Sequence, residues 1–211
     1  MKRIGVTQRV EVVESYGERR DCLDQQWAVL LASLGLSLVP VPNCLENPAA
    51  WLTELGLDGF ILSGGNDLSS LPDASRPAPE RDRTEEAVLE HAEEQRLPVL
   101  GVCRGFQFMN AHLGGRLVPV EGHVASRHGV TPVPAEPLFA GFGDVNSFHD
   151  WGVLGEGLAG ELIPGAHCAD GTVEAARHRT LPWVCVMWHP ERESPFLEAD
   201  QALLKTIFEV N

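Results

Sequence analysis

The first half of the chain alternates between short apolar runs and longer amphipathic stretches. The apolar runs lie at 4–7, 36–41, 59–62 and 98–103, and each has the length of a buried strand. Runs that stay apolar on consecutive positions, rather than on every second one, are typical of strands that are covered on both faces. This part of the pattern therefore predicts four strands of one buried sheet.

Stretches with helical periodicity lie between and after these runs. Over 19–34, leucines and Trp27 recur on one face, and Gly35 ends the pattern where helices commonly stop. Further helices are predicted over 84–95 and 106–113. Strands that alternate with helices of this length predict an α/β protein, with a mostly parallel central sheet and helices on both faces.

The second half of the chain is richer in Gly, Pro and His, and its strand candidates are shorter. They lie at 116–120, 145–148, 172–176 and 183–187, and a closing helix is predicted over 196–210. The Pro- and Ala-rich stretch 71–79 is interpreted as a surface loop and not as a linker between domains. We therefore expect a single domain over residues 1–211.

Length, composition and charge narrow the class of protein. The chain has 211 residues, 44% of them hydrophobic and 22% charged, which is ordinary for one globular domain. The formal net charge is −14 and no dense Lys/Arg stripe balances it, which argues against a nucleic-acid partner. The apolar runs are too short to span a bilayer and no signal-peptide pattern follows Met1, so we expect a cytoplasmic protein without a membrane partner.

Basic residues gather locally at 19–20 and again at Arg76, Arg81 and Arg83. Each of these arginines has two interpretations. It could bind an anionic small molecule, or it could pair with neighbouring Asp and Glu residues at the surface.

The five cysteines are odd in number and widely spaced, and they include no C-x-x-C pair. This pattern argues against a disulfide framework and against a structural zinc site built from cysteines. Cys22, Cys44, Cys168 and Cys185 are interpreted as small buried hydrophobic residues. Cys103 differs from them because of its neighbours.

The segment from Gly101 to Gly105 places Cys103 between two glycines. A buried strand precedes it and helical periodicity follows, which is the pattern of a nucleophile elbow. The glycines remove side chains that would clash in a tight strand-to-helix turn. The turn puts the thiol at a helix N-terminus, which favours thiolate, and aims the Arg104 backbone N–H at a developing oxyanion. A buried core cysteine is the alternative, and the glycines make it the weaker one.

A cysteine nucleophile needs a base, and the base needs a partner that fixes its tautomer. Among eight histidines, His189 stands out because it follows the predicted strand 183–187 and lies two residues before Glu191. On an extended segment these two side chains project to the same side, so the carboxylate can hold the imidazole toward the sulfur. We predict Cys103, His189 and Glu191 as the catalytic residues.

Four motifs occur along the chain in a fixed order. They are Gly64-Gly65-Asn66-Asp67, Gly101–Gln107, Asn146–His149 and Trp188–Glu191. With these motifs the chain resembles the class I glutamine amidotransferases, and among them the γ-glutamyl hydrolase branch, peptidase C26. The resemblance spans nearly the whole chain and implies a flavodoxin-like fold. Met187 departs from the family, which often has Gln there, and the middle of the chain is shorter than in many relatives.

The resemblance also implies a role for each motif. Cys103 would attack the γ-carbonyl of a glutamyl amide, and His189, oriented by Glu191, would protonate the departing nitrogen. Backbone N–H groups of Gly65 and Arg104 would form the oxyanion hole. The residues expected to hold the small-molecule γ-glutamyl substrate are Asn66, Gln107, Ser147, Phe148 and His149. We expect no cofactor and no metal ion.

Three further segments resemble the subgroup that hydrolyses γ-glutamyl-CDP-amidate during phosphoramidate modification of bacterial surface polysaccharide. These segments are 7–10, 16–21 and 187–193. Residues just after the first strand lie at the carboxyl edge of the sheet, so Arg9, Arg19 or Arg20 could pair with a diphosphate. Alternatively, 16–21 simply begins the first helix, and its charges serve solubility.

Several alternatives stay open at this point. The leaving group could be γ-aminobutyrate, or the chain could be a glutaminase subunit that passes ammonia to a partner synthase. A non-catalytic binding protein is disfavoured by the intact Cys103, His189 and Glu191. A metal enzyme is disfavoured because His123, His128 and His149 with Asp150 have the spacing of no standard site. The chain could also form a homodimer.

Overall fold

The computed structural model describes residues 1–210, and within them a nine-stranded sheet forms the centre of the molecule. Its strands are β1 (Arg3–Thr7), β4 (Ser37–Val41), β5 (Gly59–Leu62), β6 (Val99–Val102), β8 (Ser126–Pro132), β9 (Asp144–Ser147), β11 (Leu162–Cys168), β12 (Val173–His178) and β13 (Trp183–Val186). Their order across the sheet is β4-β1-β5-β6-β13-β12-β11-β8-β9.

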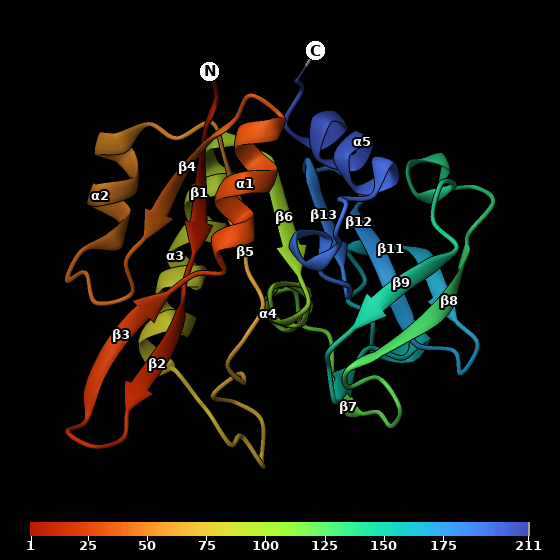
Figure 1. Cartoon of the computed structure of the whole chain (residues 1–211), viewed down its shortest axis with the longest axis horizontal. Coiled ribbons are helices and arrows are strands. Elements are labelled where there is room, and N and C mark those ends of the chain that lie inside the picture. The colour runs from red at the N-terminus through yellow and green to blue at the C-terminus, as the bar shows by residue number, and fades with distance from the viewer. Residues whose placement is uncertain (211) are drawn as a thin grey trace.

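The strands β4, β1, β5 and β6 are mutually parallel, as the alternation of apolar runs with helices predicted, and β13 joins them parallel to β6. Every residue of β5, β6 and β13 is buried, because helices cover both faces of this half of the sheet. All five strands end at the same edge, which is the lower edge in Figure 1. In open α/β sheets this carboxyl edge is where ligands bind.

Helices lie on both faces of the sheet and bury two separate hydrophobic cores (Figure 1). They are α1 (Gln25–Ser33), α2 (Pro48–Leu55), α3 (Pro79–Gln95), α4 (Arg104–His112) and α5 (Glu198–Ile207). Side chains of α1 and α5 pack into one core, and those of α2, α3 and α4 pack into the other. The predicted α/β class and layer order are confirmed. No helix among residues 1–210 is long and apolar enough to cross a membrane.

The other half of the sheet is antiparallel, which the strand candidates did not predict. Strands β12, β11, β8 and β9 extend the sheet from β13 through antiparallel pairs. Strands β8 and β11 carry Gly, Pro and His at several positions and therefore lack the apolar run that identifies a strand. A separate two-stranded ribbon pairs β7 (Val118–Pro119) with β10 (Trp151–Gly152). Short 3₁₀ helices lie at η1 (Pro137–Phe139), η2 (Gly155–Gly157) and η3 (Pro190–Arg192).

The helix predicted over 19–34 begins later than expected, so that prediction is wrong in its first six residues. Residues Arg9–Val13 (β2) and Glu18–Cys22 (β3) form an antiparallel hairpin that projects below β1 in Figure 1. Gly17 turns the hairpin with a φ of 73°. Helix α1 starts at Gln25, where the Asp24 side chain accepts a hydrogen bond from the Gln26 backbone N–H.

The remaining boundaries differ by smaller amounts. Helix α3 begins at Pro79 and not at 84, because proline at a first helical position is well tolerated. Helix α4 begins at Arg104, directly after Cys103, and not at 106. The segment 71–78 contains neither a helix nor a named strand, as expected of a surface loop.

Candidate active site

Cys103 occupies the turn between β6 and α4 and has an unusual backbone conformation. Its φ of 52° and ψ of −105° are strained for a residue with a side chain. Both flanking glycines are required sterically, since a Cβ at Gly105 would lie 2.1 Å from the Leu62 carbonyl oxygen. A Cβ at Gly101 would lie 2.9 Å from the Gly105 carbonyl carbon. These contacts explain why the predicted elbow needs glycine on both sides of Cys103.

Three adjacent strands deliver the groups of the site to one place. Strand β5 is followed by the loop at 63–67, β6 by Cys103, and β13 by the segment that carries His189. Gly64 brings the loop against the imidazole, because a Cβ at this position would lie 2.5 Å from Cε1 of His189. Segments that are far apart in sequence therefore meet at the carboxyl edge of the sheet.

His189 and Glu191 form the predicted pair, with 2.8 Å between Nδ1 and Oε1, and both side chains are buried. Glu191 lies in η3 and not on an extended segment, so the turn, rather than strand alternation, aligns the two groups. Burial alone would lower the pKa of His189. The Glu191 carboxylate and the Cys103 sulfur outweigh burial and raise this pKa to about 9. The imidazole therefore carries a proton at neutral pH.

Asn146 fixes the backbone at His189 in two directions. Its Oδ1 accepts the His189 N–H at 2.9 Å, and its Nδ2 donates to the His189 carbonyl oxygen at 2.9 Å. The same Nδ2 donates to Glu193 Oε1 at 2.7 Å. The sequence motif at 146–149 contained this residue, but only the structure shows that it binds the backbone of His189 on both sides.

Trp188 is held from the other side by a buried carboxyl group. Its Nε1 donates to Oδ1 of Asp200, 2.9 Å away in α5, and neither residue is exposed by more than 1%. Burial raises the pKa of Asp200 to about 7, and the nearby Glu193 and Glu191 act in the same direction. Above pH 7 the molecule therefore contains a buried carboxylate that is costly to keep ionised.

We expect Asp200→Asn to stabilise the protein at pH 8 by about 1–3 kcal/mol. A carboxyl group whose folded pKa lies above its unfolded value makes the native state lose stability as pH rises from about 4 to 7. Asparagine keeps the acceptor for Trp188 without the charge. Urea unfolding at pH 8 and pH 5 checks this, since the gain should be much smaller at pH 5. An equal change at both pH values would contradict the argument.

A buried ionic network connects the loop at 63–66 to the elbow. Arg81 donates to the carbonyl oxygens of Ser63, Gly64 and Gly65, and it pairs with Glu85 at 2.8 Å. The other oxygen of Glu85 accepts from the Arg104 side chain. The loop and the elbow thus share one carboxylate.

The charges in this network are maintained despite complete burial. Burial lowers the pKa of Arg81 to about 10, which leaves it protonated at neutral pH. Burial alone would raise the pKa of Glu85, but the charges of Arg104 and Arg81 outweigh it and lower the pKa. Arg81 pairs with a neighbouring glutamate as one interpretation of the sequence had it, but the pair is buried and does not lie at the surface.

A cavity of about 180 Å³ opens beside the sulfur. Its lining includes Cys103, Arg104, Gln107, Gly65, Asn66, Phe148 and His149, together with Arg76 and Asp150. This volume is well below the roughly 300 Å³ at which pockets for drug-sized ligands begin. The cavity therefore suits a group of amino-acid size.

Several of the predicted substrate residues already have partners within the protein. The Asn66 amide bonds both backbone groups of Val10, at 2.7 and 2.9 Å, and Gln107 Nε2 donates to the Trp151 carbonyl oxygen at 2.8 Å. Ser147 is fully buried, donates to the His123 carbonyl oxygen at 2.6 Å and is not among the described residues that line the cavity. Its predicted contact with substrate has no support in this geometry.

Phe148 is 40% exposed and lies edge-on to the His189 ring, with 5.6 Å between the ring centroids. The guanidinium carbon of Arg192 lies 4.3 Å from the centroid of the same phenyl ring. Phe148 thus covers the imidazole at the mouth of the site.

The three N-terminal arginines lie at different distances from this centre. Arg9 packs against Gly65, with its Cδ 3.0 Å from where a Cβ would lie. Arg19 pairs with Glu80 and lines a second cavity of about 660 Å³ beside the hairpin. Arg20 contacts Glu18 and Tyr16 and lines neither of these two cavities in the described structure.

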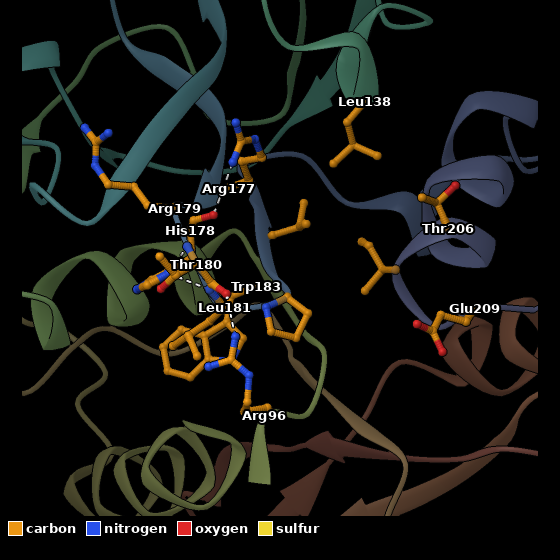
Figure 2. A pocket seen from close by; sticks show the side chains of 13 residues that line it. Arg96, Leu138, Arg177, His178, Arg179, Thr180, Leu181, Trp183, Thr206 and Glu209 are labelled. Carbon is orange, nitrogen blue, oxygen red and sulfur yellow. Dashed lines mark hydrogen bonds between the residues drawn. The ribbon is translucent and has the colours of Figure 1, made fainter. Parts of the chain in front are cut away.

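A further cavity of about 520 Å³ lies at the opposite end of β13 (Figure 2). Its lining includes Trp183, the first residue of β13, and Thr206 of α5, whereas His189 follows the last residue of that strand. This cavity is therefore remote from Cys103.

The prediction for the other cysteines is partly wrong, because Cys185 is buried but Cys44 is exposed and Cys22 and Cys168 are half-buried.

Comparisons with known proteins identify the family of this chain. The peptidase C26 family model matches residues 3–191. The chain is 33% identical to a γ-glutamyl-CDP-amidate hydrolase of Campylobacter jejuni over 192 residues, covering 90% of each chain. It is 27% identical to a glutamine-hydrolysing GMP synthase subunit of Thermoplasma acidophilum, covering 88% of this chain and 84% of that one.

Among solved structures, a glutamine amidotransferase from Thermotoga maritima has the same fold. The two superpose with a TM-score of 0.69 at 15% identity, covering 99% of this chain and 98% of the other. The family model spans nearly the whole sequence, including the elbow and the His-Pro-Glu segment. This chain belongs to the peptidase C26 family, with the fold of the class I glutamine amidotransferases.

Proposed function

We propose that this protein is a cysteine hydrolase that cleaves a γ-glutamyl amide bond with Cys103, His189 and Glu191. The observation that carries the proposal is a strained elbow cysteine beside a buried imidazole whose other nitrogen is held by a carboxylate. This is the constellation that nucleophilic acyl transfer requires. Membership of the peptidase C26 family supports the same reaction class.

The reaction follows from the state of the two central groups. The Cys103 thiolate attacks the γ-carbonyl carbon, and the carbonyl electrons move onto oxygen to give a tetrahedral oxyanion. Collapse of this intermediate breaks the C–N bond, and protonated His189 gives its proton to the departing nitrogen. His189, now neutral, then takes a proton from water, which attacks the thioester and releases glutamate with regeneration of the thiolate.

The oxyanion in both steps needs donors that are already in place. We assign this role to the backbone N–H groups of Gly65 and Arg104. Arg104 is the first residue of α4, where backbone N–H groups lack partners in the helix. The carbonyl oxygen of Gly65 is held by Arg81, which supports a fixed orientation of this loop.

The cavity of about 180 Å³ is assigned to the glutamyl group. Arg76 supplies a cation for its α-carboxylate, and Asp67 and Asp150 are the acids in the lining that could face its ammonium group. Gln107, Phe148 and His149 complete the walls. Asn66 shapes the wall through its bonds to Val10 and not through a free amide.

For the leaving group we propose a nucleotide, as in γ-glutamyl-CDP-amidate, which would place the protein in phosphoramidate modification of surface polysaccharide. The Campylobacter relative supports this substrate by its name. The cavity of about 660 Å³ contributes Arg19 and Arg83, whose guanidinium groups suit a diphosphate. Glu80 and Asp21 also line this cavity and weaken its positive potential.

The test is glutamate release from glutamine, γ-glutamyl-γ-aminobutyrate and γ-glutamyl-CDP-amidate, with Cys103→Ala as the blank. Strong preference for the nucleotide conjugate supports the proposed substrate. In that case Arg19→Ala and Arg83→Ala should raise KM for the conjugate alone, because both residues line the cavity assigned to the leaving group. Arg20→Ala serves as the matched control and should not, since Arg20 does not line it. Preference for the aminobutyrate conjugate would overturn the nucleotide assignment while keeping the chemistry.

A glutaminase that works with a synthase is the second candidate. The similarity to the Thermoplasma protein over 88% of this chain favours it, since that relative is named as one part of a glutamine-hydrolysing GMP synthase. Glutamine turnover that rises only when a synthase is added would support this function over the first.

The pH profile of the reaction tests the role of Glu191. The pKa of His189 is about 9, so kcat/KM should fall as pH rises through that value and the general acid loses its proton. Glu191→Gln removes the largest influence that raises this pKa, and we expect the alkaline limb to move down by at least about one pH unit. Measurement of kcat/KM from pH 6 to 10 for both proteins decides it. An unmoved limb would mean that another group titrates.

A further inference from the structure

Three histidines whose sequence spacing matched no standard metal site come together in the antiparallel half of the sheet. His123 lies in the loop before β8, His128 lies on β8, and His149 follows β9. All three imidazoles contact Glu174 of β12, which is 1% exposed. Asp150, considered with them from the sequence, is replaced in this cluster by Glu174 and Asp170.

Three donor atoms of this cluster form a triangle. His123 Nδ1 and His149 Nε2 are 3.2 Å apart, and they lie 3.6 and 3.7 Å from Glu174 Oε1. In tetrahedral zinc sites the ligand atoms lie about 2.0–2.2 Å from the metal, which separates them by about 3.3–3.6 Å. The triangle therefore has the size of one face of a zinc tetrahedron.

In two of these imidazoles, one ring nitrogen already lies within hydrogen-bond distance of an acceptor outside the triangle. His123 Nε2 lies 2.8 Å from Oδ2 of Asp170, and His149 Nδ1 lies 3.0 Å from the Trp151 carbonyl oxygen. Both partners can only accept hydrogen bonds, so each neutral ring donates its single N–H to its own partner. The two nitrogens that face each other then carry lone pairs, and so does Glu174. Three acceptors then converge on one point, although Glu174 Oε1 also accepts from the Thr172 hydroxyl at 3.1 Å, and a cation between them would be bound by all three.

A carboxylate or carbonyl behind each histidine is also the usual outer shell of a metal site. Such partners fix the tautomer and make the ligand nitrogen a better donor. Here Asp170 and the Trp151 carbonyl oxygen provide both. Their presence distinguishes this cluster from histidines that merely pack together.

Further donors surround the same point. Within residues 1–210, neither His128 Nε2 nor Glu174 Oε2 has a hydrogen-bond partner, and the two atoms lie 3.3 Å apart. Cys168, His123 and His128 also place one ligand atom each within 4.8 Å of one another. A buried carboxylate oxygen without a donor is costly. The two carboxylates, Asp170 and Glu174, carry two negative charges, which a divalent cation balances.

We propose that His123, His149 and Glu174 bind a zinc ion, with His128 or Cys168 beside it as the fourth donor. The ion would join the loop before β8, the segment after β9 and strand β12. Phe148 precedes His149, so the ion would also fix the residue that covers His189. The site is structural in this proposal and takes no part in bond cleavage.

The test uses the full chain in a Cys103→Ala background, because a thiolate beside an imidazole could itself bind zinc. The protein is stripped with a chelator, supplied with Zn²⁺ and freed of excess metal. We expect about one Zn²⁺ per chain and a higher Tm than that of the stripped protein. With Co²⁺ in its place, we expect the strong visible absorption of a tetrahedral site.

Variants then locate the ion. Glu174→Gln and His123→Asn should lose the bound zinc, and Asp170→Asn, which disturbs only the outer shell, should weaken its binding by about 10–100-fold. Asp170 has a 45% exposed side chain, so this variant can be compared even where the buried ones fold poorly. His112→Asn is the matched control at an exposed histidine. Zinc content near zero in the Cys103→Ala protein, or equal binding by Glu174→Gln, His123→Asn and His112→Asn, would overturn the proposal.

Discussion

Cys103→Ala should reduce the release of glutamate by at least about 10⁴-fold, because no covalent intermediate can form without the sulfur. The strained backbone at this residue has no other evident purpose, and its φ of 52° is as unfavourable for alanine as for cysteine. The variant should therefore fold like the parent and bind substrate without turning it over. Single-turnover assays with the preferred γ-glutamyl amide measure this effect.

The other half-buried or exposed cysteines provide the controls. Cys22→Ala and Cys44→Ala should keep most of the activity, since neither residue lines the cavity beside the sulfur. Cys168→Ala should also retain turnover, because Cys168 lies near the histidine cluster and not at the elbow. If one of these three variants were inactive while Cys103→Ala still released glutamate, the nucleophile would be wrongly assigned.

Glu85→Gln should destabilise the fold by about 3–5 kcal/mol, the usual cost of leaving buried charges without their counter-ion. Glu85 is fully buried and pairs with both Arg81 and Arg104, of which Arg104 also pairs with Asp82, and its Oε1 accepts from Thr7 at 2.8 Å. The denaturation midpoint in urea should fall by about 1–2 M. Because Arg81 holds the carbonyl oxygens of the loop at 63–65, kcat should fall as well.

Glu86→Gln is the matched control for this experiment. It removes the same charge from the next residue of α3, where the side chain is exposed. Surface substitutions of this kind usually change stability by less than about 0.5 kcal/mol. Equal midpoints for Glu85→Gln and Glu86→Gln would show that the buried network contributes nothing to stability.

The parallel half of the fold and the elbow could be predicted because their signals are local. Four consecutive apolar residues identify a buried strand, and glycines on both sides of Cys103 identify the turn that follows one of them. His189 could be paired with Glu191 for the same reason, since only one residue separates them. In these cases the residues that interact are close in sequence.

The remaining features depend on contacts between distant segments. Arg81 fits the surface of a charged helix, because nothing in its neighbourhood shows that the loop at 63–65 will lie over it. Residues 19–22 fit the start of a helix as well as a strand, because they are mostly polar and their backbone pairs with the other arm of their own hairpin and not with the central sheet. His123, His149 and Glu174 meet only after the antiparallel strands have formed.

Two hydrogen bonds between Val10 and Asn66 divide the hairpin into a base and a tip, which should differ in their tolerance of substitution and insertion. Val10 lines the cavity beside the hairpin, and Asn66 lines the cavity beside the sulfur. The two hydrogen bonds connect these two residues directly. The base of the hairpin is therefore tied to the loop that lines the proposed active site, and we expect an insertion there to disturb that site. The exposed tip around Gly17 lies beyond these two hydrogen bonds. Attempts to change the leaving group by design should therefore lengthen or replace the tip and keep Val10 and Asn66.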